Sequence, residues 1–210
     1  MFKKLVRKKL NKFIEGHKTD LKVLDLGCGN SPYASLFSNR VGFDFEMNRG
    51  VDVIGDAHNL PFENESFDMI LCSEVLEHLI DPKKAISEMN RVLKFGGKLV
   101  LTTRFIFPIH DAPHDYWRFT RYGLLELFKD WKIEKIIEEY DTIDTLAVIF
   151  QRIGFQSRAR LLKYFNIIFF VLPMTVKLLK LILGKEYGDI TKTHEEKSII
   201  SSGYYIVCTK

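Results

Sequence analysis

Glycines and a carboxylate follow the first apolar run of the chain. Residues 23–26 include Asp25 and lead directly into Gly27-Cys28-Gly29. Glycines let the backbone approach a ligand closely and adopt positive φ values that other residues avoid. An acid beside such a turn suits a ligand that carries positive charge, whereas it would repel the pyrophosphate of a dinucleotide. We therefore expect these four residues to bind a ligand, the alternative being an ordinary tight turn after a strand.

Two further acids follow the next two apolar runs. Residues 41–45 include Asp44 and Phe45, about 20 residues after the first acid, where a ribose diol is usually held. Glu46 is the alternative if the strand ends later. Asp56 and Ala57 follow residues 51–55, and Asp56 could accept a hydrogen bond from an adenine amino group. Asp56 alone fits a turn or cap equally well, but its place after the first two acids favours ligand binding.

A polar corner follows the fourth apolar run, residues 67–73. Ser73 ends this run, and Glu77 and His78 come shortly after it. The carboxyl ends of parallel strands meet at one edge of a sheet, where ligands bind. We expect Ser73 beside the cofactor and Glu77 and His78 on the substrate side, with helix capping as the alternative for the latter two.

A loop rich in histidine and aromatic residues, 104–120, follows the fifth apolar run at residues 98–103. We predict that His110 or His114 is a general base and that Asp115 orients a histidine. The predicted substrate contacts in this loop are Tyr116, Trp117 and Arg118. In the alternative interpretation the aromatic side chains only pack in the interior, and Arg118 pairs with Asp115 for structural reasons.

The three cysteines, Cys28, Cys72 and Cys208, are odd in number and irregularly spaced. This pattern argues against a disulfide framework and against a zinc site. We therefore expect no bound metal, and we expect the reducing environment of the cytoplasm.

Predicted strands and helices alternate along the chain, which indicates an α/β fold with a mostly parallel sheet covered on both faces. Asp81 and Thr120 are expected to cap two of the helices. The predicted strands are residues 23–26, 41–45, 51–55, 67–73, 98–103, 131–139 and 204–209, and the predicted helices are 31–38, 82–93 and 120–129.

Two segments flank the predicted core, which comprises residues 19–140 and 204–210. Residues 1–18 predict a basic amphipathic helix, with seven Lys or Arg against one Glu, so the net charge of +4 comes from this end. That distribution does not indicate a nucleic-acid-coating protein. Residues 141–203 form an insertion whose segment 157–183 predicts apolar helices. Both segments either touch an anionic membrane surface or pack over the active site. The uncharged run 164–176 is thirteen residues long, too short for a bilayer span of about 20 residues.

Residues 23–101 resemble the class I S-adenosylmethionine-dependent methyltransferases, in particular a small bacterial type 11-like group whose fourth strand leads into Glu-x-Leu-Glu-His. The resemblance implies a Rossmann-like sheet of seven strands, the last antiparallel. It implies that Asp44 holds the ribose and that Asp56 with the Ala57 amide binds adenine. The usual third glycine of the first loop is Ser31 here.

The loop at residues 104–120 is similar to one in methyltransferases often found near glycan genes. We therefore expect S-adenosylmethionine-dependent O-methylation of a small-molecule, sugar or lipid-linked glycan acceptor, in the cytoplasm or at the inner face of the membrane. The alternatives are a nicotinamide-dependent Rossmann oxidoreductase and a non-catalytic S-adenosylmethionine-binding partner protein. Ser73-Glu74-Val75-Leu76 stands where a nucleic-acid methyltransferase has its base-flipping corner, so no nucleic-acid partner is expected. The oligomeric state is not indicated.

Overall fold

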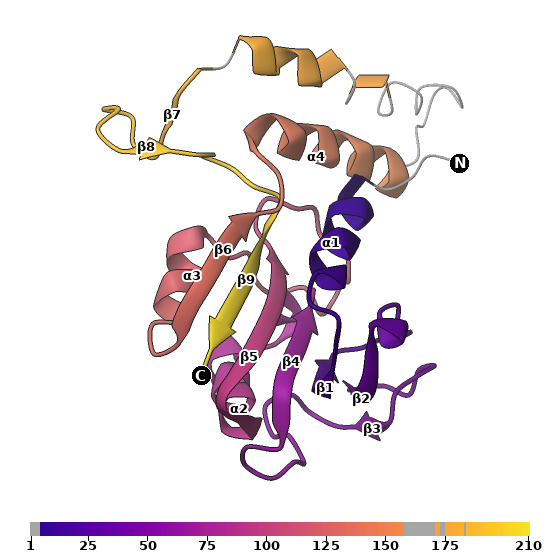
Figure 1. Cartoon of the computed structure of the whole chain (residues 1–210). Helices are drawn as coiled ribbons and strands as arrows, with labels where there is room; N and C mark the ends of the chain where they lie inside the picture. Colours follow the sequence, from indigo (N-terminus) through magenta and orange to yellow (C-terminus); the bar gives the residue numbers. More distant parts are fainter. Residues whose placement is uncertain (1–4, 158–170, 173–174, 183) are drawn as a thin grey trace.

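Figure 1 presents a computed structural model of the chain, which describes residues 5–157, 171–172, 175–182 and 184–210. A seven-stranded sheet forms the centre, and helices cover both of its faces. Most of the apolar segment predicted to be helical within residues 157–183 lies outside the described residues.

The central sheet has the strand order β3-β2-β1-β4-β5-β9-β6. The pairs among β1 to β5 are parallel, and β9 runs antiparallel to both β5 and β6. The predicted sheet with an antiparallel last strand is therefore confirmed. Strand order reverses between β1 and β4, which is where open α/β sheets bind ligands. The strands are β1 (Thr19–Leu26), β2 (Phe37–Asp44), β3 (Val53–Ile54), β4 (Phe67–Ser73), β5 (Leu93–Arg104), β6 (Lys132–Glu138) and β9 (Gly203–Thr209).

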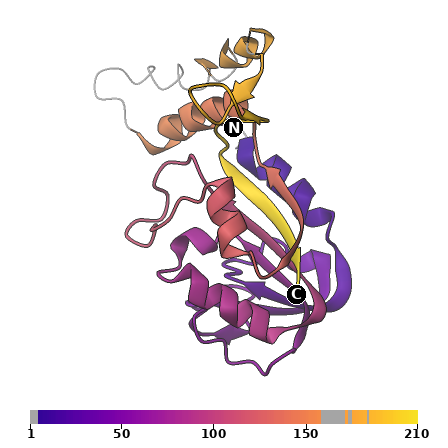
Figure 2. The ribbon, with the colours of Figure 1, turned by 90° about the vertical axis from the view of Figure 1, so that its left-hand side faces the viewer.

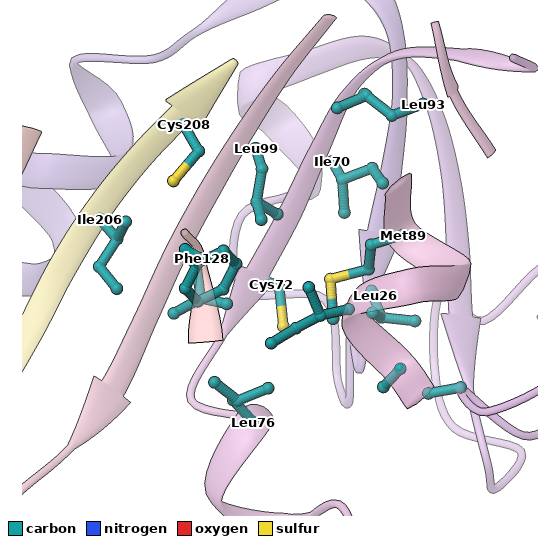
Figure 3. Close-up of a cluster of buried hydrophobic side chains, with 14 of the residues drawn as sticks. Leu26, Ile70, Cys72, Leu76, Met89, Leu93, Leu99, Phe128, Ile206 and Cys208 are labelled. Carbon is teal, nitrogen blue, oxygen red and sulfur yellow. The ribbon is translucent and has the colours of Figure 1, made fainter. Parts of the chain in front are cut away.

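The side chains of the strands form two apolar layers, one on each face of the sheet, because successive residues of a strand point to opposite faces. One layer lies under α2 (Pro82–Val92) and α3 (Arg121–Leu127) and contains Leu24 and Leu26 of β1. Figure 3 shows its centre, where Met89 and Phe128 approach residues of β4, β5 and β9. The other layer lies under α1 (Leu5–Glu15) and contains Val23. Figure 2 shows the ribbon from the side, with α1 on one side of the sheet and α2 and α3 on the other.

One predicted helix and several predicted strand boundaries differ from the structure, and β1 and β2 each begin four residues earlier than predicted. A helix over residues 31–38 is replaced by one 3₁₀ turn, η1 (Ala34–Leu36), because β2 begins at Phe37, whose side chain is buried. β5 begins at Leu93, five residues before the predicted start, because buried Leu93 already pairs with Phe67 of β4. The following irregularity in the register is accommodated by Gly96, which has φ +75°.

The predicted helix caps are confirmed. The Asp81 carboxylate accepts a hydrogen bond from the Lys84 amide at 3.0 Å, and Pro82 occupies the first helical position. The Thr120 hydroxyl accepts one from the Gly123 amide at 3.0 Å. Such caps satisfy amide groups that the first turn of a helix leaves unpaired.

The insertion begins with α4 (Thr142–Gln156), which lies across the carboxyl-end edge of the sheet (Figure 1). The 3₁₀ turn η4 (Lys177–Leu181) is tied to the start of α4, because Lys180 Nζ lies 2.7 Å from both the Asp141 and the Asp144 carboxylates. A short hairpin of β7 (Glu186–Tyr187) and β8 (Glu195–Glu196) follows. Within the described residues, no helix is long and apolar enough to cross a bilayer.

A buried ion pair joins β1 and β2. Arg40 Nε lies 2.8 Å from the Asp25 carboxylate, and both side chains are at most 9% exposed. Arg40 Nη2 also donates to Ser31 Oγ and to the Gly50 carbonyl oxygen, both at 2.7 Å. One guanidinium group therefore connects the first loop, β2 and the segment before β3. Arg40 was not identified from the sequence, although its positive charge explains why the Asp25 carboxylate tolerates burial.

The basic N-terminal helix packs on the sheet through its apolar side. Leu10 and Ile14 of α1 are buried against Val23, Met69 and Val100. We predict that Ile14→Ala lowers the free energy of unfolding by about 2–5 kcal/mol, because it removes buried methyl groups. Urea denaturation measures this effect. Exposed Lys12→Ala is the control and is expected to stay within about 0.5 kcal/mol of the parent. Equal midpoints for the two variants would contradict the docking of α1.

The Asp25–Arg40 pair leads to a second prediction, which concerns how the stability of a variant depends on pH. Burial raises the pKa of Asp25 above its ordinary value, and the hydrogen bond and charge of Arg40 oppose that shift. Arg40→Met leaves the buried carboxylate unpaired, which is expected to cost about 3–5 kcal/mol near neutral pH.

The direction of this pH dependence follows from the number of protons that the folded and unfolded states bind. A carboxyl with a raised native pKa binds more protons in the folded state, so stability falls as pH rises through that range. Without Arg40 the pKa of Asp25 rises further, so the deficit of Arg40→Met should grow between about pH 4 and pH 7. Denaturation at several pH values measures it, and adding Asp25→Asn should remove the pH dependence. A deficit independent of pH in Arg40→Met alone would refute the role of this pair.

Candidate active site

A cavity of about 740 Å³ opens at the carboxyl ends of β1, β2 and β4. All of the residues predicted to bind the cofactor contribute to its wall: Asp25, Gly27, Cys28, Gly29, Asp44, Phe45, Asp56, Ala57 and Ser73. The structure therefore brings the ends of three strands that are neighbours in the sheet to the wall of one cavity.

The first loop has the backbone geometry that its glycines suggest. Gly27 and Gly29 have φ values of +68° and +52°, and Ser31 also takes a positive φ of +51°. A side chain on Gly27 would lie 2.2 Å from Val75 Cγ2, so this position requires glycine. Gly29 has open space where a Cβ would stand, so a ligand can approach its backbone. Ser31, at the position of the usual third glycine, also has a left-handed backbone conformation, and its hydroxyl accepts a hydrogen bond from Arg40.

Asp44 lies at the end of β2 and is 5% exposed. One of its carboxylate oxygens accepts a hydrogen bond from the Gly29 amide at 2.7 Å, and the other accepts one from the Glu46 amide at 3.3 Å. The Glu46 side chain is exposed and does not contribute to the cavity wall. Of the two acids that the sequence left open, Asp44 is thus the one that faces the cavity.

Asp56 stands at the opposite rim and is exposed. Its Oδ1 accepts a hydrogen bond from the His58 amide at 2.9 Å and lies 2.6 Å from His58 Nδ1. The hydrogen bond from the His58 backbone lowers the pKa of Asp56, so the carboxylate is ionised near neutral pH. His58 Nε2 in turn accepts a hydrogen bond from the Asp81 amide at 3.2 Å, which links this loop to the start of α2.

Three histidines, His78, His110 and His114, contribute to the other end of the cavity, which we call the imidazole end. Tyr116 lies beside them, with its hydroxyl 3.0 Å from His114 Nδ1. The rings of His78 and His110 have centroids 4.8 Å apart. The loop at 104–120 therefore folds over the corner that follows β4, although the two are far apart in the sequence.

Asp115 supports this end from behind the wall. Its carboxylate lies 3.3 Å from His110 Nδ1 and accepts a hydrogen bond from the His110 amide at 3.0 Å. Hydrogen bonds from Arg118 at 2.6 and 2.8 Å hold the pKa of Asp115 well below its usual range. Burial lowers the pKa of His110 to about 4, so its ring is neutral near pH 7.

Three predicted substrate contacts have side chains that do not contribute to the cavity wall. Arg118 is engaged by Asp115 and by the carbonyl oxygens of Phe107 and Pro108, which is the structural alternative stated above. The Trp117 indole donates to the Leu79 carbonyl oxygen at 2.9 Å. Glu77 is fully buried beneath the wall, where its Oε2 accepts a hydrogen bond from the Thr103 hydroxyl at 2.7 Å.

Sequence reasoning missed a buried charged group at the floor of the cavity. Arg104, at the end of β5, forms ion pairs with Glu74 and with Glu139, the latter at 2.6 Å. Burial raises the pKa of Glu74 to about 7, and its backbone has a φ of +60°. Glu74 directly follows the end of β4, and Arg104 is the last residue of β5. Their positions at the carboxyl ends of strands could have identified them as site residues from the sequence.

The comparisons with known proteins agree with this geometry. The family described as "Methyltransferase domain" matches residues 1–159. The chain is 39% identical over 106 residues to a demethylmenaquinone methyltransferase of Paenarthrobacter aurescens, covering 44% of this chain and 42% of that relative. It is 30% identical over 168 residues to a demethylmenaquinone methyltransferase of Staphylococcus haemolyticus, covering 67% of this chain and 70% of that relative.

Among solved structures, the YcgJ protein of Bacillus subtilis matches with a TM-score of 0.56 and 16% identity, over 97% of this chain and 99% of that chain. That likeness concerns the fold. The chain spans about two fifths of the length of the first relatives it matches. The match to the methyltransferase domain covers most of the chain and includes the whole cofactor wall. The chain therefore belongs to the class I S-adenosylmethionine-dependent methyltransferase family, with S-adenosylmethionine as its cofactor.

Proposed function

We propose that the chain transfers a methyl group from S-adenosylmethionine to a hydroxyl oxygen of a small-molecule acceptor, with free or lipid-linked sugars as the favoured class. One observation carries the proposal. A single cavity has carboxylates and a glycine loop at one end and three imidazoles at the other. Imidazole is the side chain best suited to accept a proton near neutral pH.

The cofactor end suits an adenosine that carries an amino acid chain. Asp44 binds the ribose hydroxyls, while Asp56 and the Ala57 amide bind the adenine. The open space at Gly29 lets the ligand lie against the backbone. Asp25 already has Arg40 as its counter-ion, so its main contribution is the shape of the loop rather than a free negative charge.

Cys28, Phe45 and Ser73 complete the surroundings of the cofactor in this proposal. Phe45 is 67% exposed at the rim, where it can cover an adenine face. Ser73 Oγ lies 3.2 Å from Thr102 Oγ1, which fixes the end of β4 against β5.

The acceptor hydroxyl binds at the imidazole end. S-adenosylmethionine supplies an electrophilic methyl group on a sulfonium, which is an excellent leaving group. The chain aligns the acceptor oxygen about 3–3.5 Å from that carbon. His110 or His114 accepts the hydroxyl proton, and Asp115 positions His110. Such proton transfer typically accelerates a reaction by about 10²–10⁴-fold. His78 and Tyr116 contact the acceptor.

A quinone acceptor is the second candidate, because two relatives are named demethylmenaquinone methyltransferases. The apolar residues Leu79 and Ile80 on the same wall would suit an apolar ring system. The alternative of a nicotinamide oxidoreductase is excluded by the family.

The cofactor assignment predicts opposite outcomes for two neighbouring acids. Asp44→Asn is expected to weaken S-adenosylhomocysteine binding by about 10- to 100-fold, because a charged acceptor of hydrogen bonds is lost. Glu46→Gln is the matched control and should leave the affinity unchanged. Isothermal titration calorimetry measures both. If Glu46→Gln weakens binding and Asp44→Asn does not, the ribose lies elsewhere.

The reaction itself is tested by release of S-adenosylhomocysteine with a panel of acceptors: glycosides, phenols and a demethylated quinone. We expect turnover with a hydroxylated acceptor. We also expect His110→Gln or His114→Gln to reduce kcat by about 10²-fold or more while S-adenosylhomocysteine still binds. Turnover with the quinone alone, and methylation at its ring carbon, would support the second candidate and refute O-methylation.

A further inference from the structure

Glu77 carries a buried carboxylate that lacks an ion-pair partner among the described residues. The Thr103 hydroxyl donates to its Oε2 at 2.7 Å, whereas its Oε1 is buried without any hydrogen-bond partner in the described part of the chain. Arg104, which lies close by, is engaged by Glu74 and Glu139. Buried carboxylates are normally paired with a cation or coordinate a metal, because an isolated buried charge is costly.

Two imidazoles stand next to this carboxylate with one nitrogen each already engaged. His78 Nδ1 lies 2.6 Å from the His114 carbonyl oxygen. His110 Nδ1 lies 3.3 Å from the Pro108 carbonyl oxygen and 3.3 Å from the Asp115 carboxylate. Histidines that bind metals characteristically donate their other ring N–H to a carbonyl or a carboxylate. This arrangement leaves Nε2 of each ring as the nitrogen that can hold an ion.

The three groups are close enough to share one ion. One ligand atom from each of Glu77, His78 and His110 lies within 4.8 Å of the others. Tetrahedral bonds of about 2.0–2.2 Å place ligand atoms about 3.3–3.6 Å apart, so these side chains must move together by about 1–1.5 Å to share an ion. His78 and His110 also contribute to the cavity wall, so the remaining coordination positions would face the acceptor.

We propose that Glu77, His78 and His110 bind one divalent ion of the first transition series at the imidazole end of the cavity. Two imidazole nitrogens and one carboxylate suit ions such as Zn²⁺, Co²⁺ or Fe²⁺, whereas Mg²⁺ and Ca²⁺ prefer oxygen ligands. A metal was not expected from the sequence, because the ligands come from two distant segments and include no cysteine.

The ion would act on the acceptor, with His114 rather than His110 taking the acceptor proton, because both nitrogens of His110 are then engaged. That part of the inference rests on the proposed O-methylation. A hydroxyl bound to a divalent cation loses its proton more easily. Glu77, which does not reach the cavity wall, then contributes to catalysis by holding the ion from below.

Co²⁺ is the probe for the experiment, because its visible absorption reports nitrogen and oxygen ligands. Untagged protein, freed of metal with a chelator, is titrated with Co²⁺ in the absence of cofactor and acceptor. We expect one bound ion, a visible band and a rise in Tm. His78→Gln and His110→Gln should each weaken binding by at least tenfold. His114→Gln, which keeps its backbone carbonyl, and His194→Gln, in the β7–β8 hairpin loop, are matched controls and should bind as the parent does.

Glu77→Gln separates metal binding from a structural role. This variant should lose the Co²⁺ band, while the Tm of the metal-free protein stays equal or rises, because an uncompensated buried charge is removed. Binding of S-adenosylhomocysteine by each variant verifies that it is folded. No band and no Tm shift at about 1 mM Co²⁺, or equal loss of binding in His114→Gln, would overturn the proposal. Because no acceptor is present, these results are independent of whether hydroxyls are methylated.

Discussion

The Asp25–Arg40 ion pair is the interaction on which the cofactor end depends. Arg40 neutralises the buried acid that follows the first apolar run, and the same guanidinium group holds Ser31 and Gly50. This contact brings the first loop, β2 and the segment before β3 together, so that Gly29 can bond to Asp44 at 2.7 Å. Asp25 is therefore not a free negative charge available to a positively charged ligand. It is part of a charge-balanced support that keeps a left-handed loop in place.

The imidazole end has a different balance of charge, because its buried carboxylates outnumber the cations that pair with them. Arg104 binds Glu74 and Glu139 and thereby joins the ends of β4, β5 and the segment after β6. Among the described residues Glu77 has no ion-pair partner, and it lies beside two histidines whose Nδ1 atoms are engaged. One cavity thus combines a charge-balanced wall at the ends of β1 and β2 with an imidazole end above a carboxylate that lacks a counter-ion.

The features that could be predicted from the sequence are those that depend on local patterns of residues. Strands, caps and the glycine loop follow from neighbouring residues, and β4 was predicted at its observed bounds because its apolar run is framed by polar residues. The sequence did not predict contacts between distant residues. Arg40 meets Asp25 fifteen positions away, and His78 meets the loop around His114 thirty-six positions away.

The differences between the expectations and the structure also have physical causes. A helix was expected at residues 31–38 because Ser31 and Pro32 resemble a helix start, but burial of Phe37 extends β2 instead. Trp117 and Arg118 have side chains suited to binding a substrate, yet both are used to hold the loop. Residue type alone cannot separate these uses, since both depend on which partner the fold supplies.

A crystal structure with S-adenosylhomocysteine would show directly where the cofactor binds. We expect ribose hydroxyls on the Asp44 carboxylate, adenine beside Asp56, and the sulfur directed toward His78, His110 and His114. A nucleoside bound away from the ends of β1, β2 and β4, or a sulfur directed away from these histidines, would contradict this expectation.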